Sequence, residues 1–76
     1  MWWAEPIEYG GNVRAVITSG GVSVVGQGWD YTSRNIKPPK RKPSKKKLKE
    51  LADAVVQEVR EFMGAEAIPV GGADAR

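Results

Sequence analysis

A single amphipathic helix near the C-terminus constrains the fold of this chain more than any other feature. Between residues 44 and 63, apolar side chains recur at steps of three and four residues, and polar side chains fill the opposite side. The apolar positions are Leu48, Leu51, Ala52, Val55, Val56, Val59, Phe62 and Met63. Ser44 suits the N-cap, and Gly64 suits the left-handed position after the last turn. An apolar stripe on one helix must be buried, and in 76 residues only the N-terminal segment can cover it.

That N-terminal segment, residues 2–31, has the pattern of a small antiparallel sheet. The pair Gly20-Gly21 predicts a two-residue hairpin loop with both glycines at positive φ, and this loop sets Ile17 opposite Val24. Alternation along the two strands then gives one apolar face and one mixed face. The apolar face consists of Val13, Ala15, Ile17, Val22 and Val24, and the mixed face of Arg14, Val16, Thr18, Ser23, Val25 and Gln27. The apolar face is therefore the one expected to meet the helix.

Two further glycine-rich stretches complete the predicted sheet. A three-residue loop over 10–12 places Glu8 opposite Arg14 as a cross-strand ion pair and keeps the apolar residues of the first strand on the core face. The stretch 26–28, Gly-Gln-Gly, predicts a bulge that bends the third strand before Trp29. The expected sheet is thus a three-stranded meander.

The sequence as a whole predicts an α+β protein with one small domain over residues 1–63. A three-stranded antiparallel meander (2–31) is followed by a basic, proline-rich connector (32–43), an amphipathic helix (44–63) and a flexible C-terminal tail (64–76). The chain contains no cysteine and no histidine, which excludes disulfides, Cys/His zinc sites, thiol nucleophiles and imidazole bases. The serines have no histidine to activate them, and the carboxylates are expected on the solvent side of the helix. We therefore expect no enzymatic activity, no cofactor and no metal.

The net charge of +3 conceals a strong local imbalance. The segment Lys37–Lys49, which we call the basic arm, contains eight cations and no acid. These cations are Lys37, Lys40, Arg41, Lys42, Lys45, Lys46, Lys47 and Lys49. The rest of the chain has four cations and nine acids, a net charge of −5. Such an asymmetry indicates an anionic partner.

Four interpretations of the basic arm remain open from the sequence. It is a solvated surface, a set of contacts to nucleic-acid phosphates, a nuclear-import signal, or a docking segment for an acidic protein surface. We favour contacts to the phosphates of DNA or RNA, because three prolines keep the first half extended and the lysines occupy helical positions where the macrodipole favours acids. Arg14, Gln27 and Arg34 are added as candidates for contacts to bases or phosphates.

The adjacent tryptophans Trp2 and Trp3 support a second hypothesis. Neighbouring strand residues point to opposite faces, so one indole is expected in the core and the other on the open face of the sheet. An exposed indole is typical of a protein-binding hot spot. The alternative function is therefore a small adaptor or inhibitor, for instance a viral regulator of a host complex, that binds protein through Trp2 or Trp3 and the open sheet face.

The sequence also bears on location and assembly. No stretch approaches the roughly 20 apolar residues of a membrane span, and the first residues lack the pattern of a signal peptide. We expect a cytoplasmic protein, nuclear in a eukaryotic host, without membrane contact. Val16 and Val25 on the open face are compatible with a monomer or a weak dimer.

Overall fold

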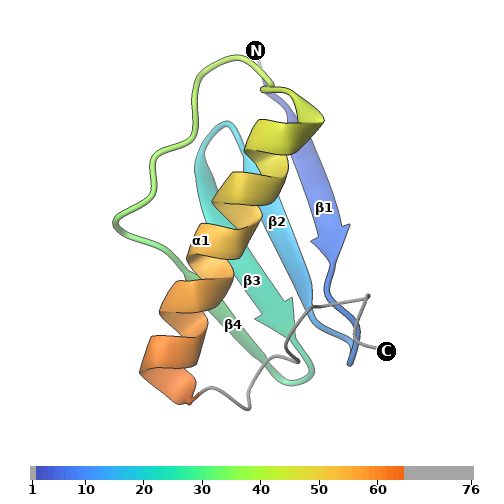
Figure 1. Ribbon diagram of the computed structural model, residues 1–76, viewed down its shortest axis with the longest axis vertical. Helices are drawn as coiled ribbons and strands as arrows, with labels where there is room; N and C mark the ends of the chain where they lie inside the picture. Colours follow the sequence, from blue (N-terminus) through green and yellow to red (C-terminus); the bar gives the residue numbers. More distant parts are fainter. Residues whose placement is uncertain (1, 65–76) are drawn as a thin grey trace.

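Four antiparallel strands and one helix make up the protein in the computed structural model, which describes residues 2–64 (Figure 1). The elements are β1 (Ala4–Glu8), β2 (Arg14–Thr18), β3 (Gly21–Gly26), β4 (Trp29–Thr32) and α1 (Lys45–Met63), and the strand order in the sheet is β1-β2-β3-β4. The predicted α+β class, with an antiparallel sheet and one C-terminal helix, is confirmed. Of the tail that was predicted over 64–76, residues 65–76 lie outside the described part of the chain.

The sheet has four strands, so the prediction of three was wrong. The stretch 26–28 is a hairpin turn and not a bulge: Gly26 pairs with Trp29, and Gln27 and Gly28 form the loop. Gly28 has a φ of +80°, which a residue without Cβ adopts at little cost. The chain after this turn runs back along β3 as β4, with Tyr31 opposite Val24.

The register between β2 and β3 also differs from the prediction. Ile17 pairs with Val22, and the loop consists of Ser19 and Gly20, neither at positive φ. The hydroxyl oxygen of Thr18 accepts hydrogen bonds from the backbone N–H groups of Gly20 (3.1 Å) and Gly21 (3.0 Å), which closes the turn one position earlier than expected. The register shifts by two residues, so the side chains within β2 and β3 keep their predicted faces. Gln27, which was predicted on the mixed face, lies instead in the loop between β3 and β4.

The hairpin between β1 and β2 matches its prediction. Its loop spans residues 10–12, and the backbone N–H of Tyr9 donates to the carbonyl oxygen of Val13 (2.8 Å). Glu8 lies opposite Arg14, and their side chains form an ion pair with 2.7 Å between carboxylate and guanidinium. The choice of a three-residue loop on the basis of this ion pair is confirmed.

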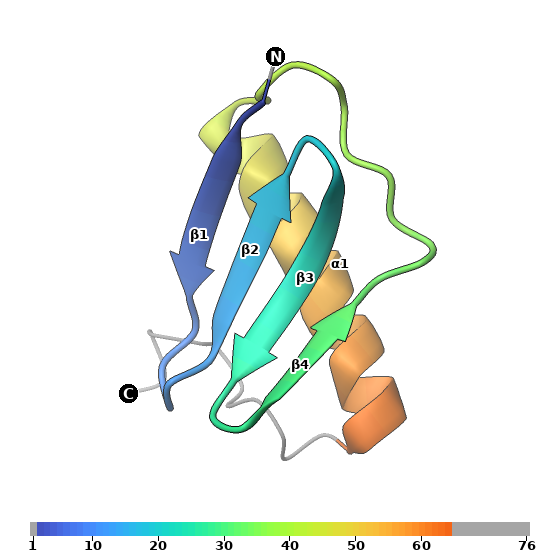
Figure 2. The same ribbon diagram turned by 180° about the vertical axis from the view of Figure 1, so that it is seen from behind.

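The hydrophobic core lies between α1 and one face of the sheet, and no helix within residues 2–64 covers the opposite face (Figures 1 and 2). Its residues are Trp3, Tyr9, Val13, Ala15, Ile17, Val22, Val24, Leu48, Leu51, Ala52, Val55, Val56 and Val59. All of the apolar sheet positions that were expected to meet the helix are among them. The helical stripe is buried as far as Val59, whereas Phe62 is 77% exposed, with its ring centroid 5.9 Å from that of Tyr31 in β4.

Two acidic side chains that were expected on the solvent side of α1 connect the helix to the sheet. The hydroxyl of Tyr9 donates a hydrogen bond to Asp53, and that of Tyr31 donates to Glu58 (2.9 Å). Burial first, and then the hydrogen bond to Asp53, raise the pKa of Tyr9. Burial alone would raise the pKa of Asp53, but hydrogen bonds from Lys49 and Tyr9 outweigh it and lower that pKa.

These two shifts predict stability that falls at both ends of the pH range. The pKa of Tyr9 is raised, so its contribution is complete below about pH 10 and is lost as the pH rises further. The pKa of Asp53 is lowered, so its contribution is present above about pH 4 and is lost as the pH falls. Tyr9→Phe is expected to lower the free energy of unfolding by about 1–2 kcal/mol near neutrality and to weaken both slopes. Urea unfolding at acid, neutral and alkaline pH checks this, and a variant with an unaltered pH profile would contradict it.

Candidate nucleic-acid interface

The connector between β4 and α1 is fixed to the domain at both of its ends. Near its start, Ser33 is buried; its backbone N–H donates to the carbonyl oxygen of Val22 (2.9 Å), and its hydroxyl donates to the carboxylate of Glu58 (3.2 Å). Near its end, the indole Nε1 of Trp3 donates to the carbonyl oxygen of Lys40 (3.0 Å). The connector runs past the β4 side of the sheet and over the end where α1 begins (Figure 2). The first half of the basic arm is thus held against the body of the protein.

The cations of the basic arm are all exposed, but they differ in their partners. Three form ion pairs: Lys42 with Glu5 (2.8 Å), Lys47 with Glu50 (3.9 Å) and Lys49 with Asp53 (2.8 Å). Within residues 2–64, no carboxylate pairs with the other five, which are Lys37, Lys40, Arg41, Lys45 and Lys46. The arm therefore retains most of its positive charge for an external partner.

The start of α1 adds to this concentration of charge. Ser44 is the N-cap, and its hydroxyl oxygen accepts the N–H of Lys47 (3.3 Å), as the sequence predicted. The first turn contains lysines and no acid. A cation at the positive end of the helix macrodipole costs about 0.3–1 kcal/mol at low salt. An anion bound at this end would relieve both the dipole and the repulsion among the lysines.

A pocket opens where the arm crosses the N-terminal strand region. Trp3, Lys40, Arg41 and Lys42 line it, and its volume is about 620 Å³. Trp3 is only 7% exposed, so it forms the floor, while the three cationic residues are exposed. This pocket joins one of the two predicted protein-binding tryptophans to the predicted nucleic-acid-binding residues.

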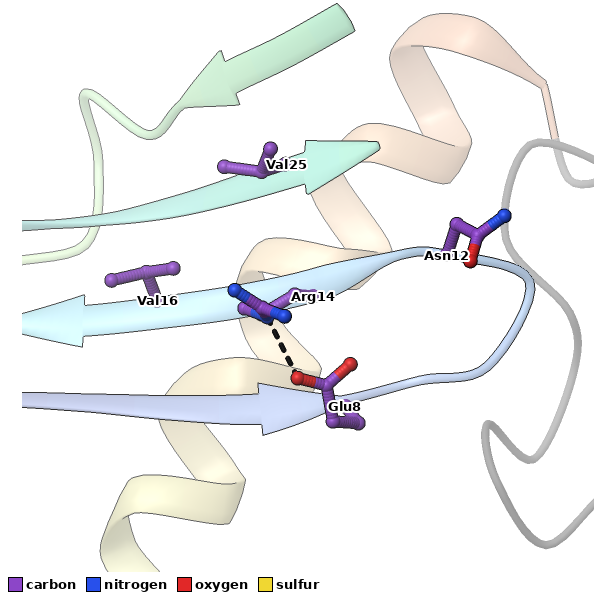
Figure 3. A pocket seen from close by; sticks show the side chains of 5 residues that line it. All are labelled: Glu8, Asn12, Arg14, Val16 and Val25. Carbon is purple, nitrogen blue, oxygen red and sulfur yellow. Dashed lines mark hydrogen bonds and ion pairs between the residues drawn. The ribbon is translucent and has the colours of Figure 1, made fainter. Parts of the chain in front are cut away.

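Arg14 and Gln27 are not part of this cluster. They lie at the end of the sheet that carries the β1–β2 and β3–β4 loops, whereas the arm enters α1 at the opposite end (Figures 1 and 2). A hollow of about 300 Å³ on the open face includes Arg14, but Glu8 neutralises its guanidinium there (Figure 3). Gln27 accepts a long hydrogen bond, 3.5 Å, from Asn12. Arg34 is exposed in the connector, before the arm begins.

Trp2 and Trp3 have opposite environments, as the strand alternation predicted. Trp2 is 69% exposed, and its ring lies beside Gly20, where an added Cβ would come within 3.3 Å of it. Both residues precede β1, which begins at Ala4; Trp3 belongs to the hydrophobic core, and Trp2 remains available for a partner.

Sequence reasoning missed the hydrogen bond between Trp3 and Lys40 and the role of Ser33. A buried indole N–H generally needs an acceptor, but nothing local in the sequence identifies a carbonyl 37 positions away as that acceptor.

No helix among the described residues is long and apolar enough to cross a membrane. Comparison of the chain with protein-family models, curated proteins and solved structures gives no match.

Proposed function

We propose that this protein is a small binding module that contacts nucleic acid through the basic arm. The observation that carries this proposal is the set of five exposed cations that have no carboxylate partner among residues 2–64. Phosphates of a DNA or RNA backbone would neutralise them, and release of the condensed counterions would supply the free energy.

The attachment of the arm supports the same function. Contacts of Ser33 with Val22 and Glu58, of Lys40 with Trp3 and of Lys42 with Glu5 hold the connector to the body of the protein. Less conformational entropy is therefore lost when its cations engage a ligand. Contacts of this kind position a nucleic acid without reading its sequence. The proposed activity is therefore weakly dependent on base sequence and strongly dependent on salt.

Salt dependence tests this proposal. Five phosphate contacts predict that the logarithm of the association constant falls with the logarithm of salt concentration with a slope of about −3.5 on single strands or −4.5 on duplex DNA. Fluorescence anisotropy with labelled DNA and RNA, from about 50 mM salt upward, measures this slope. Absence of binding to every DNA and RNA probe at the lowest salt would overturn the proposal, as would a slope near zero.

A protein partner is the second candidate, and the exposure of Trp2 favours it. Val25, on the open face toward the other end of the sheet, is 43% exposed and adds a second exposed apolar side chain. A regulator that docks on another protein through this face would lose binding in Trp2→Ala but would tolerate neutralisation of the arm, which would chiefly slow association. Binding of nucleic acid by a Trp2→Ala variant with unchanged affinity separates the two functions.

A further inference from the structure

We infer that the pocket at Trp3 receives an unpaired nucleobase, so that the arm prefers single-stranded nucleic acid to duplex. This inference rests on the proposed function and specifies its ligand. It starts from a feature of the arm that phosphate contacts alone do not require, an open pocket of about 620 Å³ lined by Trp3, Lys40, Arg41 and Lys42. Its volume lies in the range of about 300–1,000 Å³ that is typical of small-molecule sites.

The chemistry of the lining suits a nucleotide. The Nε1 of Trp3 is already bonded to the carbonyl oxygen of Lys40, so the indole offers apolar surface to the pocket and no free donor. The side chains of Lys40, Arg41 and Lys42 combine aliphatic stems with cationic ends. Arg41 adds a planar guanidinium, which stacks on base faces and forms paired hydrogen bonds with phosphate. The apolar indole would contact the flat base, and the surrounding cations would contact the phosphates of the backbone to which the base is attached.

The surroundings of the pocket extend this match to a strand. Lys37 precedes the pocket along the chain, and Lys45 and Lys46 follow it at the start of α1, all three exposed and without a carboxylate partner among residues 2–64. Phosphates on either side of a seated base would therefore meet cations in both directions. In a duplex the bases are stacked and paired, and each must be unstacked before it can enter a pocket. A single strand presents its bases at a lower cost.

The test compares three labelled probes of about 12 nucleotides, a length within the usual range of single-strand sites. They are a single strand, its duplex, and an abasic strand that keeps the phosphates and lacks the bases. At about 0.1 M salt, the single strand is expected to bind about tenfold more tightly than the abasic strand and the duplex. Equal affinity for the normal and abasic strands would overturn the pocket and leave the proposed function intact. If none of the probes binds, both proposals fail.

A pair of charge-conserving variants then locates the base. Arg41→Lys keeps the charge and removes the planar group, so it is expected to lower the ratio of single-strand to abasic affinity at least threefold. Lys46→Arg, a matched change outside the pocket, should leave that ratio unaltered. Circular dichroism of both variants establishes that each is folded. A ratio that is the same in both variants and in the unaltered protein would overturn the assignment of the base to this pocket.

Discussion

Neutralising Lys40, Arg41 and Lys46 together is expected to weaken binding of single-stranded nucleic acid about 100-fold at 0.1 M salt. Each lost phosphate contact on a single strand lowers affinity about fivefold at this salt concentration, because about 0.7 of a counterion is no longer released. The three residues are exposed and have no carboxylate partner within residues 2–64. Their replacement by glutamine therefore removes positive charge without breaking an ion pair among those residues. Anisotropy titration of the triple variant measures the effect, and the salt slope should become shallower by about 2.

The matched control removes the same net charge from cations that already have partners. Arg14, Lys47 and Lys49 pair with Glu8, Glu50 and Asp53, and glutamine at these three positions is expected to weaken binding less than about tenfold. A difference between the two triple variants shows that the location of the charge matters. If both variants bind alike, total charge governs the affinity, and the five arm cations without a carboxylate partner among residues 2–64 have no special role, which contradicts our account.

Replacing Gly26 by alanine is expected to lower the free energy of unfolding by about 2–3 kcal/mol. The indole of Trp29 lies directly over this glycine, and an added Cβ would come within 2.1 Å of the ring. The ring packs against the hydrophobic core, so moving it aside exposes apolar area and loosens the β3–β4 hairpin. In a domain of this size that loss is a large part of the total stability. Thermal and urea unfolding, followed by circular dichroism, measure it.

Gly21 in the same strand provides the control for this substitution. An alanine Cβ there would have no heavy atom within 4 Å, and its φ is not positive. Gly21→Ala is therefore expected to be neutral or to stabilise the protein by up to about 1 kcal/mol. Equal destabilisation by the two substitutions would show that the loss of glycine itself, and not the displaced indole, causes the effect.

The parts of the fold that could be predicted are those in which several local signals agree. In the helix, the apolar spacing, the N-cap Ser44 and Gly64 at its end all indicate one element, and it spans Lys45–Met63. In the first hairpin, the ion pair between Glu8 and Arg14 selects one loop length, and the structure has that loop.

The errors arose where the prediction of a turn or bulge rested on the positions of glycines alone. Gly20-Gly21 resembles a hairpin loop, but the hydroxyl of Thr18 stabilises a turn that begins one residue earlier, and a side-chain bond of this kind leaves no periodic signal. The stretch 26–28 is compatible with a bulge or with a turn. In the structure it is a turn: Trp29 and Tyr31 beyond it pair with Gly26 and Val24, and the Trp29 ring lies against Gly26.

Composition predicted the positive charge of the arm but not its arrangement. Which lysines pair with acids depends on contacts across the fold, such as that between Lys42 and Glu5. The pocket depends on a hydrogen bond between Trp3 and Lys40, which are distant in sequence. Long-range contacts of this kind follow from the assembled tertiary structure, so the sequence places the candidate residues in one segment without showing that a tryptophan joins them.

An NMR titration of the isotope-labelled protein with a single-stranded oligonucleotide tests the central claim most directly. We expect the chemical-shift changes to concentrate on the backbone amides of residues 37–49 and on the indole N–H of Trp3, and to diminish as salt is added. The indole N–H of Trp2 and the amides of Val16 and Val25, which are on the open sheet face, should change little, because none of these residues belongs to the basic arm or lines the pocket. Changes confined to that face, or no changes at low salt, would contradict the basic arm as the nucleic-acid interface.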